Sequence, residues 1–314
     1  MKLTGKVAKY QAFLSKPLYN DSSLTSVRRE QNALGKQLFR ILKRHVRVEN
    51  HTVGSVPCFT VSPIDTSLPG IILYLHGGGF VCGGAEYARG FASLLAAKCG
   101  APVFACAYSL APEQPFPTQL DEALAAYGHL LSVGYSPREI FLCGDDAGAC
   151  LCYSLCLKLK ALKRESPRGI IAISPWVDLT APRRCRTGEN SRASVSLANL
   201  NVLGSCYVYG SMHGESKPDC LLKDPFAGME MKRRSIVSPI FADLSDMPPS
   251  LIFAQAEGVL HDNAISLLEE LKKRGSDAML LVIKNTFYLH TPRDFCKDCE
   301  IFDGIAEFIR TRTD

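Results

Sequence analysis

The strongest constraint on the fold of this chain is a regular alternation of short apolar runs with helix-like segments. Six runs of five to seven residues are separated by longer, amphipathic stretches. The runs cover residues 71–75, 102–108, 139–144, 169–174, 250–256 and 278–283. A continuous apolar run is typical of a strand that is buried on both faces. The alternation therefore predicts an α/β fold with a doubly wound, mostly parallel sheet.

Two segments depart from this alternation. Residues 1–45 carry apolar residues at helical spacing, including Val27, Leu34 and Leu38, and predict an N-terminal helical cap segment. Residues 180–246 begin with a stretch rich in Ser, Arg, Gly and Pro, which fits a lid inserted into a core of residues 46–314. Together, the cap and the lid are expected to cover a site at the carboxyl ends of the strands.

Composition and charge exclude several classes of partner. The 314 residues are 46% hydrophobic and carry a net charge of +5, and their basic clusters are separated and lack interleaved aromatics. This pattern favours solvated faces over a nucleic-acid surface. The chain shows no signal-peptide core, and no run reaches the roughly 18 apolar residues that a membrane span needs. We therefore expect a cytoplasmic protein with no membrane span, whose thirteen scattered cysteines are mostly buried thiols.

Two glycine-containing motifs follow predicted strands and carry the candidate chemistry. "YLHGGGFVCGG" (residues 74–84) can turn tightly and present backbone N–H groups to a ligand, and "GDDAG" (residues 144–148) turns a strand into a helix. The first motif lacks the Lys-Ser/Thr of a phosphate loop and the spacing of a dinucleotide site. Cys296 and Cys299 form a single CxxC without the second pair that zinc requires. We expect no cofactor and no metal.

Taken together, these motifs resemble those of the hormone-sensitive-lipase-like carboxylesterases of the α/β-hydrolase fold. "YSLAPEQPFP", "SPWVDLT" and "VSPIFADL" match that family in the same order. The resemblance implies an oxyanion hole formed by the N–H groups of Gly78, Gly79 and Ala147. We place His76, which opens the glycine-rich turn, and Trp176 at the ligand pocket, with a packed core aromatic as the alternative for Trp176.

The family's catalytic positions are substituted. Asp146 stands where the family has its nucleophilic serine, Gly258 matches the position of the acid, and Tyr288 matches that of the histidine. A serine hydroxyl needs a base, and the base needs an orienting carboxylate. The sequence therefore predicts a catalytically degenerate homologue that binds a small acyl or ester-like ligand, with enzymatic activity left open.

Two active alternatives use neighbouring residues. Asp146 is a possible nucleophile of epoxide-hydrolase or dehalogenase type, because a carboxylate needs no base for the first attack. His290 and Glu257 would then have to activate the water that hydrolyses the ester intermediate. Alternatively, His290 and Glu257 support a residual esterase activity by activating water directly. An interaction scaffold without a ligand remains a further alternative.

Overall fold

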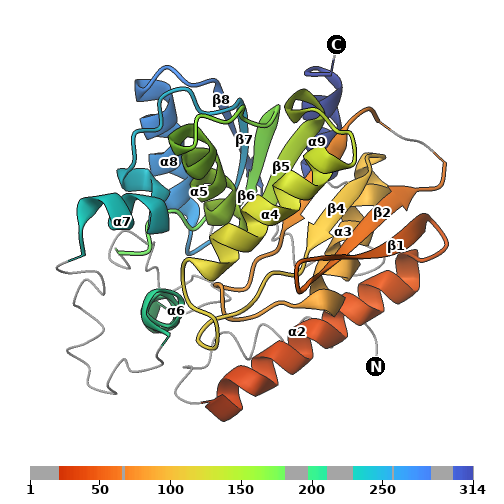
Figure 1. Ribbon diagram of the computed structural model, residues 1–314, viewed down its shortest axis with the longest axis horizontal. Helices are drawn as coiled ribbons and strands as arrows, with labels where there is room; N and C mark the ends of the chain where they lie inside the picture. The colour runs from red at the N-terminus through yellow and green to blue at the C-terminus, as the bar shows by residue number, and fades with distance from the viewer. Residues whose placement is uncertain are drawn as a thin grey trace.

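The computed structural model describes residues 21–65, 68–180, 197–210, 229–256, 258–283 and 300–313. At its centre lies an eight-stranded sheet in the order β1-β2-β4-β3-β5-β6-β7-β8, with helices on both faces (Figure 1). Six strands that are neighbours in the sheet run parallel to one another: β4, β3, β5, β6, β7 and β8. β1 and β2 are antiparallel to their neighbours at one edge. The predicted α/β fold with a doubly wound, mostly parallel sheet is confirmed.

Each of the six apolar runs in the sequence coincides with a strand. The strands are β1 (Val46–Val53), β2 (Val56–Pro63), β3 (Ile71–Leu75), β4 (Val103–Cys106), β5 (Ile140–Asp145), β6 (Gly169–Ile173), β7 (Ser250–Gln255) and β8 (Ala278–Ile283). β3, β4, β5 and β6 are buried along their whole length. Their continuous apolar character therefore follows from helices covering both faces of the sheet.

Eight α-helices are defined in the described residues. They are α2 (Asp21–Leu42), α3 (Ala85–Cys99), α4 (Thr118–Ser132), α5 (Ala147–Ala161), α6 (Leu197–Tyr209), α7 (Met231–Val237), α8 (His261–Lys273) and α9 (Glu300–Arg310). α3 packs on β2 and β4 and contacts α9. α5 packs on β5 and β6 and contacts α4, and α8 packs on β7 and β8. The sheet is thus held between helical layers.

The N-terminal helix α2 lies across the outside of α3 (Figure 1). Leu24, Val27, Leu34 and Leu38 are buried on its inner face, as the helical spacing predicts. The two helices approach so closely that a Cβ on Gly35 would lie 2.2 Å from the carbonyl oxygen of Glu86. The region of 1–45 that the structure describes is therefore packed onto the core.

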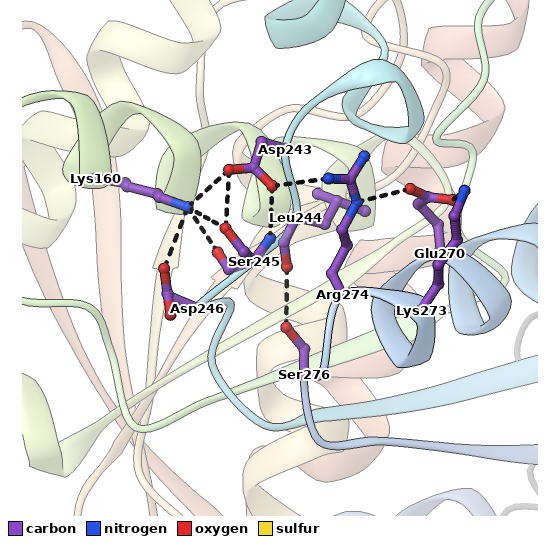
Figure 2. Close-up of polar contacts among 9 residues, drawn as sticks. All are labelled: Lys160, Asp243, Leu244, Ser245, Asp246, Glu270, Lys273, Arg274 and Ser276. Atoms are coloured by element: carbon purple, nitrogen blue, oxygen red, sulfur yellow. Dashed lines mark hydrogen bonds and ion pairs between the residues drawn. The ribbon is translucent and has the colours of Figure 1, made fainter.

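A polar network fixes the chain where it re-enters the sheet after α7. Lys160, in the last turn of α5, donates hydrogen bonds to the backbone and side-chain oxygens of Ser245 and forms ion pairs with Asp243 and Asp246 (Figure 2). Arg274, which follows α8, also pairs with Asp243. α5 begins at the strand-to-helix turn, so this network lies at the opposite end of a helix about 22 Å long.

Some predictions on organisation stay untested. The division into a cap at 1–45, a core at 46–314 and a lid at 180–246 remains a prediction, because residues 1–20, 181–196 and 211–228 lie outside the described residues.

Within the described part of the chain, no helix combines the length and apolar content needed to cross a bilayer. All nine cysteines described are buried free thiols. Cys296 and Cys299 lie outside the described residues.

Candidate functional site

The strand-to-helix turn after β5 has the geometry of a nucleophile elbow. Asp146 sits between β5 and α5 with φ 51° and ψ −114°, a conformation that costs a non-glycine residue about 1–3 kcal/mol. The flanking glycines allow the tight approach of strand and helix. A Cβ on Gly148 would lie 1.9 Å from the carbonyl oxygen of Leu75, and one on Gly144 would lie 2.3 Å from Gly148. The elbow is therefore intact, although the residue at its tip is an aspartate.

Asp145, the residue before the tip, connects the elbow to the glycine-rich loop that follows β3. Its fully buried Oδ1 accepts a hydrogen bond of 2.7 Å from the hydroxyl of Tyr74 and one of 3.0 Å from the N–H of Gly77. No room remains for a side chain on Gly77, since a Cβ there would lie 2.3 Å from Asp145 Oδ2. Asp145 therefore positions the loop.

The loop directs its N–H groups at the carboxyl of Asp146. Gly78 N–H donates to Asp146 Oδ2 at 3.2 Å, and Gly79 N–H donates to the same oxygen at 3.0 Å. Gly78 adopts φ 116°, a conformation that favours glycine. The Ala147 backbone is a further group that lowers the pKa of this carboxyl. Two of the three N–H groups that the resemblance implies as oxyanion donors, those of Gly78 and Gly79, thus donate to the side chain of Asp146.

Burial and hydrogen bonding act on Asp146 in opposite directions. Burial raises the pKa of its carboxyl, whereas the hydrogen bonds from Gly78, Gly79 and Ala147 lower it, and the pKa lies above its ordinary value. The residue as a whole keeps partial exposure to solvent. Among the described residues, no Lys, Arg or His is ion-paired with this carboxyl. The carboxyl is therefore held mainly by backbone dipoles.

His76 is a buried, neutral residue that braces the same loop. Its Nδ1 lies 2.8 Å from the carbonyl oxygen of Gly77, and the N–H of Gly84 lies 3.5 Å from its Nε2. This arrangement fits a proton on Nδ1. The ring stacks on Tyr108 with centroids 4.1 Å apart. Because burial lowers the pKa of His76 to about 4, the ring is uncharged at neutral pH.

Helix α6 covers the glycine-rich loop. The ring of Tyr207 stacks on that of Phe80 with centroids 3.6 Å apart, and a Cβ on Gly79 would lie 2.7 Å from Leu203 Cδ1. Sequence analysis placed this segment in the lid at 180–246 but predicted no helix within it, because the segment lacks the alternation seen elsewhere. The one indication in the sequence was Phe80, an apolar aromatic residue directly after the three glycines, which needs an apolar partner to pack against.

Trp176 follows β6 and is hydrogen-bonded to the elbow through its backbone. Its backbone N–H donates to the carbonyl oxygen of Asp146 at 3.2 Å, and its ring centroid lies 6.3 Å from that of Phe80. The side chain is 1% exposed, as is typical of a packed aromatic. The assignment of His76 and Trp176 to a ligand pocket remains a prediction.

Arg28 links the N-terminal helix to the site and was also missed by sequence analysis. Its guanidinium donates to the carbonyl oxygens of Val81 at 2.6 Å and Ala111 at 2.7 Å. It also forms a bidentate ion pair with Glu113, at 2.6 and 2.8 Å. Val81 belongs to the glycine-rich loop, so α2 fixes the outer end of that loop. A single arginine in a helix with other basic residues gave no signal for this contact.

Of the remaining predicted positions, the structure describes Gly258 alone. Gly258 lies in the turn between β7 and α8, where its N–H donates to the carbonyl oxygen of Gln255 at 3.1 Å. A side chain there would meet Gln255, with a Cβ 3.0 Å from Gln255 Cβ. Glu257, Tyr288 and His290 lie outside the described residues. Their roles stay predictions.

Comparison with known proteins places this elbow and loop in a family. A family model described as the alpha/beta hydrolase fold matches residues 72–290. An acetyl-hydrolase of Streptomyces hygroscopicus is 34% identical over 206 residues, which are 65% of this chain and 62% of that protein. The hormone-sensitive lipase of Bos taurus is 34% identical over 158 residues, or 48% of this chain and 20% of that protein.

Solved structures agree over the whole chain. A crystal structure of an esterase from the bacterial hormone-sensitive lipase family is 25% identical, with a TM-score of 0.76 and coverage of 99% of this chain and 98% of that one. A mutant of the esterase E40 is 26% identical, with a TM-score of 0.79 and coverage of 99% and 98%. The chain belongs to the α/β-hydrolase fold family, and its resemblance to the hormone-sensitive-lipase-like carboxylesterases is confirmed.

The similarity in sequence covers only part of the relatives. The first three curated relatives are matched over 60–62% of their own length. The chain is an esterase-like α/β-hydrolase.

Proposed function

We propose that the chain is a catalytically degenerate member of this family that binds a small ligand, acyl or ester-like in kind, in the former acyl pocket. The observation that carries the proposal is the position of Asp146 Oδ2, at 3.2 Å from Gly78 N and 3.0 Å from Gly79 N. Ester hydrolysis in this family needs those N–H groups for the oxyanion of the tetrahedral intermediate. Here a carboxyl oxygen already takes them.

An ester that entered this site would meet two obstacles. Its carbonyl oxygen could reach Gly78 and Gly79 only by displacing Asp146 Oδ2, with the loss of both hydrogen bonds. The negative charge that develops on that oxygen would also lie beside the carboxyl of Asp146, where like charges repel. Asp146 has no hydroxyl to attack the ester, and Gly258 has no carboxylate to orient a base. These features favour binding without turnover.

Hydrolysis of p-nitrophenyl acetate, butyrate and octanoate tests the proposal. The protein and its Asp146→Ala variant are compared with a matched variant, Glu165→Gln, which removes an exposed carboxylate distant from the elbow in sequence. We expect the unaltered protein to be no faster than Asp146→Ala, since the smaller side chain frees the N–H donors. Turnover that is lost in Asp146→Ala and kept in Glu165→Gln would refute the degenerate assignment.

One observation favours a second candidate, in which Asp146 is a nucleophile. Because Oδ2 is held by the loop, Oδ1 remains to attack a carbon atom. Attack on an alkyl halide would form a C–O bond to Asp146, while the carbon–halogen bond breaks and the halide leaves with the electron pair. The ester carbonyl oxygen would then already lie against Gly78 and Gly79. Hydrolysis of the ester would require His290 and Glu257, whose roles stay predictions.

Intact-protein mass spectrometry separates the two candidates. After incubation with a halogenated acid or an epoxide, the second candidate requires an added alkyl mass that is absent from Asp146→Asn. We expect no adduct that depends on Asp146. A stoichiometric adduct that maps to this residue would favour the nucleophilic reaction over the binding function.

The cytoplasmic location expected from the sequence belongs to the same proposal. The nine described cysteines, all buried free thiols, support a reducing compartment.

A further inference from the structure

We infer that the ligand of this site presents a protonated amine to Asp146, so that the site selects small cationic amines over carboxylates and plain esters. This inference rests on the proposed binding function and narrows its ligand: an acyl or ester-like compound binds here through an amine group that it also carries, and not through its carbonyl oxygen. Three features of the elbow carry it: the occupied N–H groups, the lack of an ion-paired cation at the carboxyl within the residues that the structure describes, and the partial exposure of Asp146.

The occupied N–H groups exclude the usual mode of ligand capture. A carboxylate or carbonyl oxygen is an acceptor and needs donors, but Gly78 and Gly79 already donate to Asp146 Oδ2. The surface that faces the ligand is therefore an acceptor itself. A ligand that binds here needs hydrogen-bond donors, and an ammonium group supplies three.

The charge around Asp146 favours a cation. The neighbouring carboxyl of Asp145 is fully buried and bonded to Tyr74 and Gly77. Arg28, which is hydrogen-bonded to the same loop, forms an ion pair with Glu113. Within the described ranges, no basic side chain is ion-paired with Asp146. A buried carboxylate without a countercharge is unfavourable, and a cationic ligand would provide that countercharge.

Asp146 is more exposed than its neighbours in the turn. Ala147 and Asp145 on either side are buried, whereas Asp146 keeps partial exposure to solvent. Burial raises the pKa of its carboxyl, and pairing with an ammonium group would favour the ionised form and lower that pKa.

Matched probe pairs test this inference. Isothermal titration calorimetry at neutral pH and low salt compares butylamine with butyrate, and benzylamine with benzoate and methyl benzoate. We expect at least one amine to bind the unaltered protein, and its acid and ester partners to bind about tenfold or more weakly. In Asp146→Asn, which keeps the size of the side chain and removes its charge, amine binding falls about tenfold. Asp146→Ser also removes the charge and serves as a second variant, with the same expected loss of amine binding.

The exposed-charge variant Glu165→Gln controls for non-specific attraction of cations and should bind the amine as the unaltered protein does. Equal or tighter binding of butyrate, benzoate or methyl benzoate would overturn the inference, as would amine binding that Asp146→Asn leaves unchanged. Binding of none of the probes would also overturn it. These outcomes leave the proposed lack of turnover standing, since only ester hydrolysis that depends on Asp146 contradicts that proposal.

Discussion

At the scale of the residue, one side chain changes what an otherwise intact elbow can do. By family resemblance, the sequence puts Asp146 at the position of the nucleophile, and a helix begins beside it. It could not show where the side chain points. In the structure, Oδ2 accepts hydrogen bonds from Gly78 and Gly79, while burial raises the pKa of the carboxyl. Side-chain direction depends on the loop after β3, some seventy residues away in sequence.

Removal of the charge at Asp146 should stabilise the fold near neutral pH. Because the folded-state pKa is raised, the unfolded chain carries the charged form more easily, and stability from this group is lost as pH rises through the folded pKa. Asp146→Asn keeps an acceptor for Gly78 and Gly79 and removes that loss. We expect a melting temperature about 2 °C higher than that of the unaltered protein at pH 7. The difference should vanish on acidification to about pH 3, and a lower melting temperature at pH 7 would contradict the sign.

His76 should give the stability a distinct dependence on pH. The ring stays neutral in the fold down to about pH 4, whereas in the unfolded chain it takes up a proton below its ordinary value of 6.5. Stability from this group is therefore fully present above pH 6.5 and falls by about 1.4 kcal/mol per unit as the pH is lowered towards 4. Urea unfolding at pH 7, 6 and 5 measures it. In His76→Gln, the free energy of unfolding should fall less steeply with decreasing pH, by the contribution of one proton, about 1.4 kcal/mol per pH unit. An unchanged slope would count against a buried neutral ring.

At the scale of the element, the strands and helices of the core were predictable, but their contacts were not. Gly100 caps α3 in the left-handed conformation with φ 68°, as is typical of a glycine that directly follows a helix. α6 lies in a segment without clear periodicity, so neither its existence nor its stacking on Phe80 could be predicted. Arg28 contacts residues that are more than fifty positions away. Such contacts depend on how elements pack.

The two glycines of α4 and α5 should respond to the same substitution with opposite signs. Gly148→Ala puts a Cβ at 1.9 Å from the carbonyl oxygen of Leu75, so α5 must move away from β3. We expect a loss of more than about 3 kcal/mol in the free energy of unfolding, or no folding. Gly128→Ala, in α4, meets nothing within 4 Å and should gain about 0.5–1 kcal/mol. Urea denaturation of both variants measures the contrast, and equal effects would contradict the close strand–helix approach.

At the scale of the whole molecule, the parallel sheet brings distant motifs to one edge. The loop after β3, the elbow after β5 and Trp176 after β6 follow strands that are neighbours in the sheet, with β5 between β3 and β6. The alternation of apolar runs predicts this convergence, because carboxyl ends of parallel strands lie together. The family resemblance also implies three N–H groups as oxyanion donors. It left open what fills them, since that depends on the rotamer of a single carboxyl group.

The most direct test of the account is the pH titration of the backbone amides of Gly78 and Gly79 by NMR. If Asp146 Oδ2 accepts both N–H groups, both amide proton shifts should move together between about pH 3 and pH 8 with one midpoint above 3.8, the ordinary value for this carboxyl. The titration should disappear in Asp146→Ala, while the Gly77 amide, bonded to Asp145, should remain shifted. Amide shifts of Gly78 and Gly79 that do not depend on pH, or that titrate equally in Asp146→Ala, would show that the carboxyl does not accept these two N–H groups.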